Sequence, residues 1–203
     1  MKNEFKKLID ISNKCASYQT KNLSKSEALF LLIDQEVNKL KNAGINFSFE
    51  CGGIKYSLPL NIENIFFRPL FKMATHAKIK EANADDTHAV DFDVPVGTEV
   101  YSVSDGIVTA IQSDSSTGGN NKEFAGKDNY LYIYNEKENR IYCYRHLERF
   151  SNLKLNSLIK KGMLLGRIGL TGYVITPHLH FVIYEIDKKG KYLLKSIPIK
   201  FIQ

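Results

Sequence analysis

The sequence predicts an antiparallel β protein of many short strands from residue 45 to the C-terminus. Two observations predict this class. Apolar and polar residues alternate over short runs such as 46–51, 54–58 and 88–94, which is typical of strands that bury one face. Turn residues separate the runs, as at Gly52-Gly53, so that neighbouring strands are expected to pair as hairpins.

Residues 1–44 are expected to form an N-terminal helical segment. Ser24 and Glu27 have the spacing of a capping box, and Gly44 is the expected end of the helix. Between them, apolar residues recur at helical spacing: Leu29, Leu32, Ile33, Val37 and Leu40. We expect this segment to pack as a satellite against one main domain, 45–203. A docking or autoinhibitory arm is the alternative.

The middle of the chain predicts a series of strands and one long loop. Strands are expected on either side of the turn signal Asp105-Gly106, which would make 99–111 a hairpin. The Gly-, Ser- and Asn-rich residues 113–129 are expected to form a loop, either as a wall of a substrate groove or as a flexible connector. Residues 140–147 are expected to form a strand with Tyr142, Tyr144 and His146 on one face.

Composition narrows the function classes. The chain has 203 residues, 43% of them hydrophobic, with eleven Tyr and twelve Phe, which is enough for a globular core. No apolar run is long enough to span a bilayer, and the start lacks the apolar segment of a secretory signal. This leaves open a cytosolic chain, export by another route, and a trimmed chain.

Charge and cysteine content give two further indications. The net charge of +6 suits an anionic polymer such as a cell wall, but Lys and Arg form no stripe with interleaved aromatics, so nucleic acid is not expected as a partner. The three cysteines, Cys15, Cys51 and Cys143, lack a zinc-finger spacing. Buried free thiols are expected, with one disulfide as the alternative for an exported chain.

The stretch from Thr176 to Tyr184 carries the chemistry. In a strand, His178 and His180 share one face while Leu179 and Phe181 anchor the other in a core. Two neighbouring imidazoles can hold a metal together, or divide the work between a ligand and an acid/base. A half-buried strand with two polar histidines is the alternative.

Several segments, in order, resemble the lysostaphin-type (LytM-like) zinc endopeptidases that cut peptidoglycan cross-links. The matching segments are 89–92, 95–101, 105–108, 144–147, 160–162, Gly166, Gly169, 171–172 and 177–181. The resemblance covers roughly residues 58–201. It implies a small antiparallel β sandwich with a groove over one sheet.

The resemblance also implies site roles. Asp91 and His180 match zinc ligands of the family, and His146 and His178 match its two non-ligand histidines. A zinc ion with three protein ligands activates a water, and neutral or protonated imidazoles can move a proton or stabilise an oxyanion. Tyr144 is expected to pack rather than to donate to the site.

The first zinc ligand departs from the family pattern. The usual histidine stands four residues before the aspartate, where this chain has Thr87. His88 stands three before Asp91, so alternation sends it to the opposite face. His76, upstream of a polar stretch that can fold back, is the favoured ligand, as in relatives with a displaced histidine. Asp93 is expected to be exposed or to cap a turn, and Asp85 and Asp86 are expected to be solvated loop charges.

Two functions compete at this point. The first is a zinc endopeptidase acting on peptide stems or cross-bridges of bacterial peptidoglycan in the cell envelope or outside the cell. The second, motivated by Thr87, is a metal-free binding module that regulates or recruits a wall hydrolase. A toxin, effector or phage lysis factor is a third use of the same chemistry, with an immunity or regulatory protein as partner.

Overall fold

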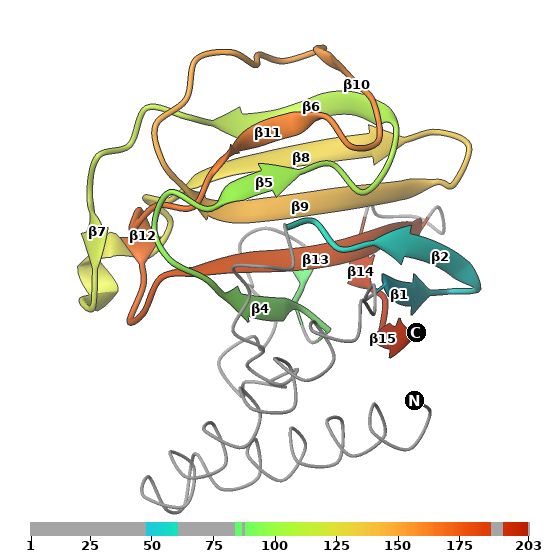
Figure 1. Ribbon diagram of the computed structural model, residues 1–203, viewed down its shortest axis with the longest axis horizontal. Coiled ribbons are helices and arrows are strands. Elements are labelled where there is room, and N and C mark those ends of the chain that lie inside the picture. The colour runs from blue at the N-terminus through green and yellow to red at the C-terminus, as the bar shows by residue number, and fades with distance from the viewer. Residues whose placement is uncertain (1–47, 61–83, 87, 188–192, 203) are drawn as a thin grey trace, which may run out of the picture.

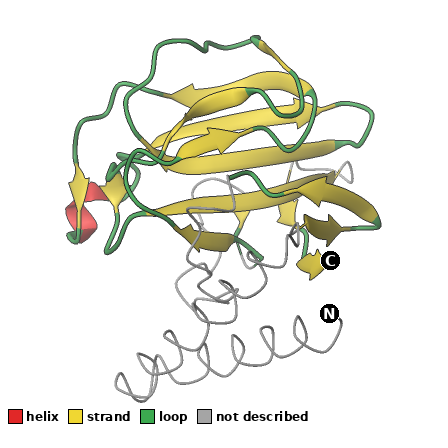
Figure 2. Cartoon of the chain, viewed as in Figure 1, coloured by secondary structure: helices red, strands yellow, loops and turns green. Residues whose placement is uncertain are grey.

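The computed structural model describes residues 48–60, 84–86, 88–187 and 193–202. These residues form β-strands and one short 3-10 helix, η3 (Lys122–Phe124). The strands gather in two layers (Figure 1). The predicted mainly β, antiparallel fold is therefore confirmed, and strands dominate the drawing by secondary structure (Figure 2).

The larger layer is a twisted sheet with the order β10-β6-β8-β9-β13-β14-β3. Its strands are β10 (Leu158–Ile159), β6 (Gly106–Gln112), β8 (Asn129–Asn135), β9 (Arg140–Leu147), β13 (His178–Asp187), β14 (Leu193–Ser196) and β3 (Ala84–Asp85). Strand β4 (Val90–Asp93) pairs with the first half of β13, on the edge opposite β9. β13 is thus the strand that joins the two halves of the sheet.

Smaller sheets complete the fold. One has the order β15-β1-β2, with β15 (Ile199–Ile202), β1 (Ser48–Cys51) and β2 (Ile54–Ser57). A second pairs β11 (Leu164–Arg167) with β5 (Glu99–Tyr101), and a third pairs β12 (Gly172–Tyr173) with β7 (Gly118–Gly119) in parallel. In Figure 1, β5 and β11 lie over β6, β8 and β9 as the second layer.

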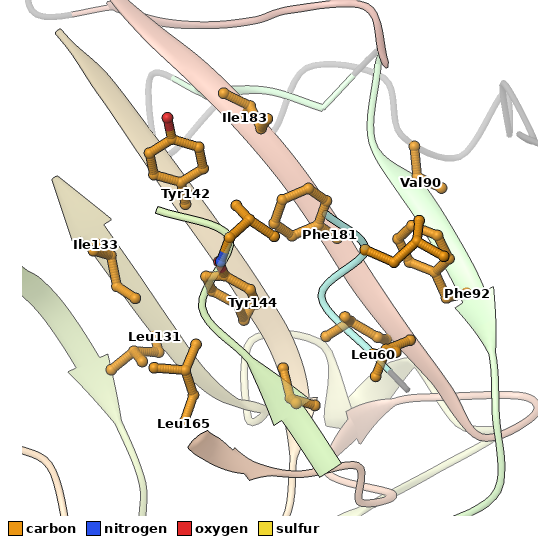
Figure 3. Close-up of a cluster of buried hydrophobic side chains, with 14 of the residues drawn as sticks. Leu60, Val90, Phe92, Leu131, Ile133, Tyr142, Tyr144, Leu165, Phe181 and Ile183 are labelled. Carbon is orange, nitrogen blue, oxygen red and sulfur yellow. The ribbon is translucent and has the colours of Figure 1, made fainter. Parts of the chain in front are cut away.

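The main core lies between these layers. Leu131, Ile133 and Tyr144 of the large sheet pack in one buried cluster with Val100 of β5 and Leu165 of β11. Phe181 and Phe92 extend the cluster toward β4, with their ring centroids 6.4 Å apart (Figure 3). This core takes one face of β9 and β13. The other face of the same strands carries a smaller buried cluster with Cys143, Val182 and Tyr184, together with polar side chains.

The first predicted hairpin is confirmed. β1 and β2 pair antiparallel, and Gly52 and Gly53 have φ angles of 52° and 79°. Two successive positive φ angles are what a two-residue turn of this kind requires, and glycine adopts them without steric cost.

The predicted hairpin over 99–111 is wrong. β5 pairs with β11, and β6 pairs with β8 and β10, so the chain crosses from one layer to the other between them. Gly106 is needed at the crossing because an added Cβ would lie 2.5 Å from the Tyr134 carbonyl oxygen. The dipeptide therefore marks a close backbone approach rather than a hairpin turn.

Several predictions fall outside the described residues. The helical segment 1–44, its boundary with the domain at residue 45, Cys15 and His76 all belong to this group. Cys51 and Cys143, which are described, are buried free thiols as predicted. Within the described ranges, no helix has the length and apolar character that crossing a bilayer requires.

Candidate functional site

Strand β13 places its two histidines on the face turned away from the main core. Leu179 and Phe181 are fully buried in that core, as their alternation predicted. His180 lies directly opposite Asp91 of β4 in the strand register. The antiparallel pairing of β4 with β13 therefore brings together an imidazole and a carboxylate that are 89 residues apart in the sequence.

His180 lies between two carboxylates. Its Nδ1 is 3.0 Å from Oδ1 of Asp91, and its Nε2 is 3.7 Å from Oδ2 of Asp86. The imidazole is only 4% exposed, and burial on its own would lower its pKa. The two carboxylates outweigh burial and raise the pKa of His180 to about 9. The two carboxylates therefore favour a positive charge at His180.

His178 also faces Asp91. Its Nε2 lies 3.8 Å from Oδ1 of that carboxylate, and its Nδ1 lies 2.7 Å from the carbonyl oxygen of Thr176. A carbonyl can only accept a hydrogen bond, so Nδ1 carries a proton. In the neutral ring, Nε2 is then an acceptor. It faces Asp91, the carboxylate that His180 also faces.

A β-bulge brings His146 to this group. Tyr130 pairs with Arg145 and Asn129 with Leu147, which leaves His146 as an extra residue on β9. Its φ of 63° is in the left-handed region, where few residues other than glycine occur. The bulge turns the His146 ring toward His178, with the two centroids 4.7 Å apart at 65°. The centroid of His180 is 6.0 Å away.

The bulge corrects the prediction that Tyr142, Tyr144 and His146 share a face. Tyr144 is fully buried in the main core, where its hydroxyl accepts from the Val103 N–H at 3.0 Å. Its predicted packing role is confirmed. Simple alternation fails here because the extra residue reverses the side on which His146 lies.

Thr171 fixes the orientation of the His146 ring. Its carbonyl oxygen accepts from Nδ1 of His146 at 2.9 Å, so the neutral ring presents an acceptor at Nε2. The Thr171 hydroxyl donates to the Leu147 carbonyl and accepts from the Asn129 N–H. Burial, together with the neighbouring His178 and His180, lowers the pKa of His146 to about 3. His146 is therefore neutral at physiological pH.

Asp86 is a site neighbour that the sequence did not reveal. It was expected to be a solvated loop charge, but it is 2% exposed, and it accepts a hydrogen bond from the Tyr184 hydroxyl. A turn between β3 and β4, closed by the Ala89 N–H donating to the Asp86 carbonyl at 2.9 Å, buries it. Tyr184 is the residue from which such a carboxylate could have been predicted, because a buried hydroxyl on the histidine face of β13 needs an acceptor.

Asp128 and Arg145 form a second feature that the sequence did not reveal. The guanidinium donates to both carboxylate oxygens at 2.7 and 2.9 Å, and both side chains are largely buried. Burial alone would raise the pKa of Asp128, but Arg145 lowers it. Gly172 packs so close to Asp128 that an added Cβ would lie 2.5 Å from the Asp128 Cβ. The pair therefore holds the loop that carries Thr171 beside β9.

The 113–129 loop is attached to this same region. Its strand β7 pairs with β12, and an added Cβ on Gly118 would lie 1.8 Å from the Leu170 carbonyl oxygen. The loop is therefore packed against the segment that positions His146. Contact with a substrate stays a prediction.

The donor atoms around Asp91 fit part of a zinc site. Two donors at about 2.1 Å from a tetrahedral ion lie roughly 3.4 Å apart. The separation of 3.0 Å between Asp91 Oδ1 and His180 Nδ1 needs only a small opening to match. Carboxylate oxygen and imidazole nitrogen are both usual zinc donors. Among the described residues, no three His, Cys, Asp or Glu side chains make a complete metal-binding set.

The third ligand therefore stays a prediction. His76, the favoured residue, lies outside the described ranges. His88 lies in the turn before β4, where its backbone N–H donates to Oγ of Ser196 at 3.2 Å. Asp93, opposite His178 in the strand register, is half-buried rather than exposed.

Comparison with known proteins identifies the family. The model of peptidase family M23 matches residues 85–193, more than half of the chain, so the chain belongs to this family. The matched segment includes both carboxylates and all three histidines of the site.

Three relatives and one solved structure illustrate the similarity. The glycyl-glycine endopeptidase ALE-1 of Staphylococcus capitis is 34% identical over 99 residues, covering 49% of this chain and 25% of the relative. The peptidoglycan DD-endopeptidase ShyB of Vibrio cholerae is 30% identical over 114 residues, 55% of this chain and 24% of its own. Lysostaphin of Staphylococcus simulans is 33% identical over 94 residues, covering 46% of this chain and 17% of the relative.

The solved structure is a zinc containing peptidase from Vibrio cholerae. It is 28% identical, with a TM-score of 0.43, and the match covers 62% of this chain and 35% of that one. The chain thus spans a quarter or less of the curated relatives described above.

Proposed function

We propose that this chain is a zinc-dependent endopeptidase that hydrolyses peptide bonds in the stems or cross-bridges of bacterial peptidoglycan. The observation that carries the proposal is the convergence of His178 Nε2 and His180 Nδ1 on one oxygen of Asp91, at 3.8 and 3.0 Å. Membership of family M23 and relatives named as endopeptidases support it.

His76, Asp91 and His180 are the proposed zinc ligands. When bound, the ion supplies Lewis-acid activation of a water molecule. Asp91 and His180 come from paired strands, so the sheet itself sets their separation. His76 is the proposed third ligand because Thr87, in the usual family position, is a poor zinc donor.

His146 and His178 are the proposed proton-transfer residues. His146 is held neutral, with its Nδ1–H bonded to the Thr171 carbonyl, so its Nε2 can accept a proton from the attacking water. His178, oriented in the same way by Thr176, is the second imidazole and can donate to the developing oxyanion when it is protonated. The two rings lie 4.7 Å apart, close enough to serve one scissile bond.

Substrate and location follow from this assignment. A wall-cutting enzyme acts in the cell envelope or outside the cell, and we propose residues 45–203 as the domain that carries the activity. A metal-free binding module remains the competing function, motivated by Thr87. Retention of Asp91, His146, His178 and His180 in one cluster supports the enzyme instead.

A murein digestion tests the proposal. The full chain is incubated with purified sacculi of two kinds, one with direct cross-links and one with pentaglycine bridges, and released peptides are identified by mass spectrometry. We expect cleavage of at least one kind, loss with a chelator, recovery with added zinc, and little activity from His178→Ala. A folded protein that leaves both kinds uncut with zinc present would contradict the proposal.

A further inference from the structure

Asp86 is a buried carboxylate that the proposed chemistry does not use. It follows β3 directly and is 2% exposed. One of its oxygens accepts from the Tyr184 hydroxyl, and the other lies 3.7 Å from Nε2 of His180. Burying a carboxylate is costly unless donors compensate it, so the groups that face it identify its role.

Tyr184 and His180 belong to the same face of the same strand. They are four residues apart on β13, where alternate side chains point the same way. The three side chains therefore lie in sequence: the Tyr184 hydroxyl donates to Asp86, and Asp86 faces the ring of His180. The rest of this face around Tyr184 is apolar, with Ala89, Cys143 and Val182 in one buried cluster.

The two nitrogens of His180 are directed to two different carboxylates. Nδ1 faces Asp91, and Nε2 faces Asp86. The two nitrogens of an imidazole point in different directions, so an ion that binds one nitrogen of His180 reaches only the carboxylate on that side. An ion held by Asp91 must therefore use Nδ1, and Nε2 must then carry the ring proton, on the side of Asp86.

We propose that Asp86, held by Tyr184, is a positioning residue that fixes the orientation and tautomer of His180 so that Nδ1 is presented to the metal. This inference rests on the proposed zinc site. The 3.7 Å separation is longer than a direct hydrogen bond, and we expect it to shorten to hydrogen-bond range when Nδ1 binds the ion. Carboxylates that orient metal-binding histidines commonly change metal affinity about 10- to 100-fold.

The chain offers a matched control. Glu138, a half-buried carboxylate on the turn between β8 and β9, accepts hydrogen bonds from the Tyr56 and Tyr142 hydroxyls. It therefore has the same kind of tyrosine partner as Asp86, but no histidine is among its described hydrogen-bond partners. A variant at Glu138 reports the general cost of disturbing such a carboxylate.

The test measures the zinc dissociation constant of the full chain by competition with a chromophoric chelator. Asp86→Asn should weaken zinc binding about 10- to 100-fold, Tyr184→Phe should weaken it less, and Glu138→Gln should leave it within about twofold. An unchanged constant for folded Asp86→Asn would overturn the inference. A wild-type chain that binds no zinc would instead refute the proposed function.

A measurement on the wild type covers the case in which Asp86→Asn does not fold. Long-range ¹H–¹⁵N spectra of the zinc-loaded chain, labelled at its histidines, show which ring nitrogen carries the proton. We expect His180 to be protonated at Nε2 and to bind zinc through Nδ1. Protonation at Nδ1 would contradict the inference whatever the variants do.

Discussion

Strand β9 has a buried polar cluster at each end, and the two differ in how their donors and acceptors balance. The Glu138 cluster comprises Tyr56, Ser104, Asn135, Glu138, Arg140 and Tyr142. The histidine cluster comprises Asp86, Asp91, His146, His178 and His180.

In the Glu138 cluster, most donors have an acceptor, although Nε of Arg140 is buried without a hydrogen-bond partner among the described residues. Two tyrosine hydroxyls and the Asn135 amide donate to the Glu138 carboxylate. Arg140 donates to the Tyr56 hydroxyl at 2.7 Å and to the Cys51 carbonyl at 2.9 Å. Burial and the Glu138 carboxylate raise the pKa of Tyr56 to about 12, so its hydroxyl stays protonated. This cluster ties the β1–β2 hairpin to the large sheet.

The histidine cluster is rich in acceptors instead. Asp86 and Asp91 flank one imidazole, and two further imidazoles have their Nδ1 protons directed to backbone carbonyls. The nearby guanidinium of Arg145 is bonded to another carboxylate, Asp128. An acceptor-rich, buried group of this kind favours a cation. The two clusters therefore differ in chemistry. In the first, one carboxylate accepts from several neutral donors and ties parts of the fold together. In the second, two carboxylates flank one imidazole, and a proton on His180 or a bound cation would balance their charge.

His178→Ala should have the largest effect and should separate catalysis from metal binding. We expect peptide release from sacculi to fall about 10²- to 10⁴-fold, because a proton-transfer group is lost. Zinc content should stay at the wild-type level, since His178 is not a proposed ligand. Loss of zinc together with activity would instead make His178 a ligand. Glu138→Gln, in the other cluster, serves as the activity control.

Asp128→Ala should destabilise the fold by about 3–5 kcal/mol, because it leaves the buried Arg145 guanidinium without its carboxylate. Urea denaturation followed by circular dichroism measures the change. The substitution should also lower activity, since the loop that carries Thr171 and orients His146 packs on Asp128. An unfolding free energy within about 1 kcal/mol of the wild-type value would show that the ion pair has no structural role.

Tyr142→Phe should have a smaller effect, confined to stability. It removes one hydroxyl that donates to Glu138 and lies 3.0 Å from the Tyr56 hydroxyl. We expect a loss of about 1–3 kcal/mol in unfolding free energy, as for other buried hydrogen bonds, with the zinc affinity unchanged. A change in zinc affinity would mean that the two clusters are coupled along β9.

The stability of the metal-free chain should also depend on pH. The folded pKa of His180 is about 9, above the ordinary value of 6.5. The folded state therefore holds a proton that the unfolded state releases, and its stability contribution is full below pH 6.5 and lost as the pH rises through 9. Chemical denaturation from pH 6 to 10 should show this decline, and His180→Phe should remove it.

Local alternation was enough to predict part of the site. It placed His178 and His180 on one face and Leu179 and Phe181 in the core, because strand side chains have a period of two. The resemblance then added Asp91 and His146, and the structure brings both to the same place.

The remaining features depend on partners far away in the sequence. The bulge at His146 follows from the register of β8 with β9, and the crossing at Gly106 follows from the position of β8. Asp86 is buried because β3 pairs with β14 and brings it to Tyr184. The residues that neighbour these positions in the sequence carry no pattern that indicates such contacts, so the contacts could not be predicted from the local sequence.

Zinc content per chain tests the central claim most directly. The full chain and its Asp91→Ala variant are loaded with zinc, dialysed and analysed by inductively coupled plasma mass spectrometry. The same measurement on His76→Ala and His88→Ala identifies the third ligand. We predict one zinc in the wild type, none in Asp91→Ala or His76→Ala, and one in His88→Ala. A folded wild type without zinc, or an Asp91→Ala variant that keeps it, would contradict the account.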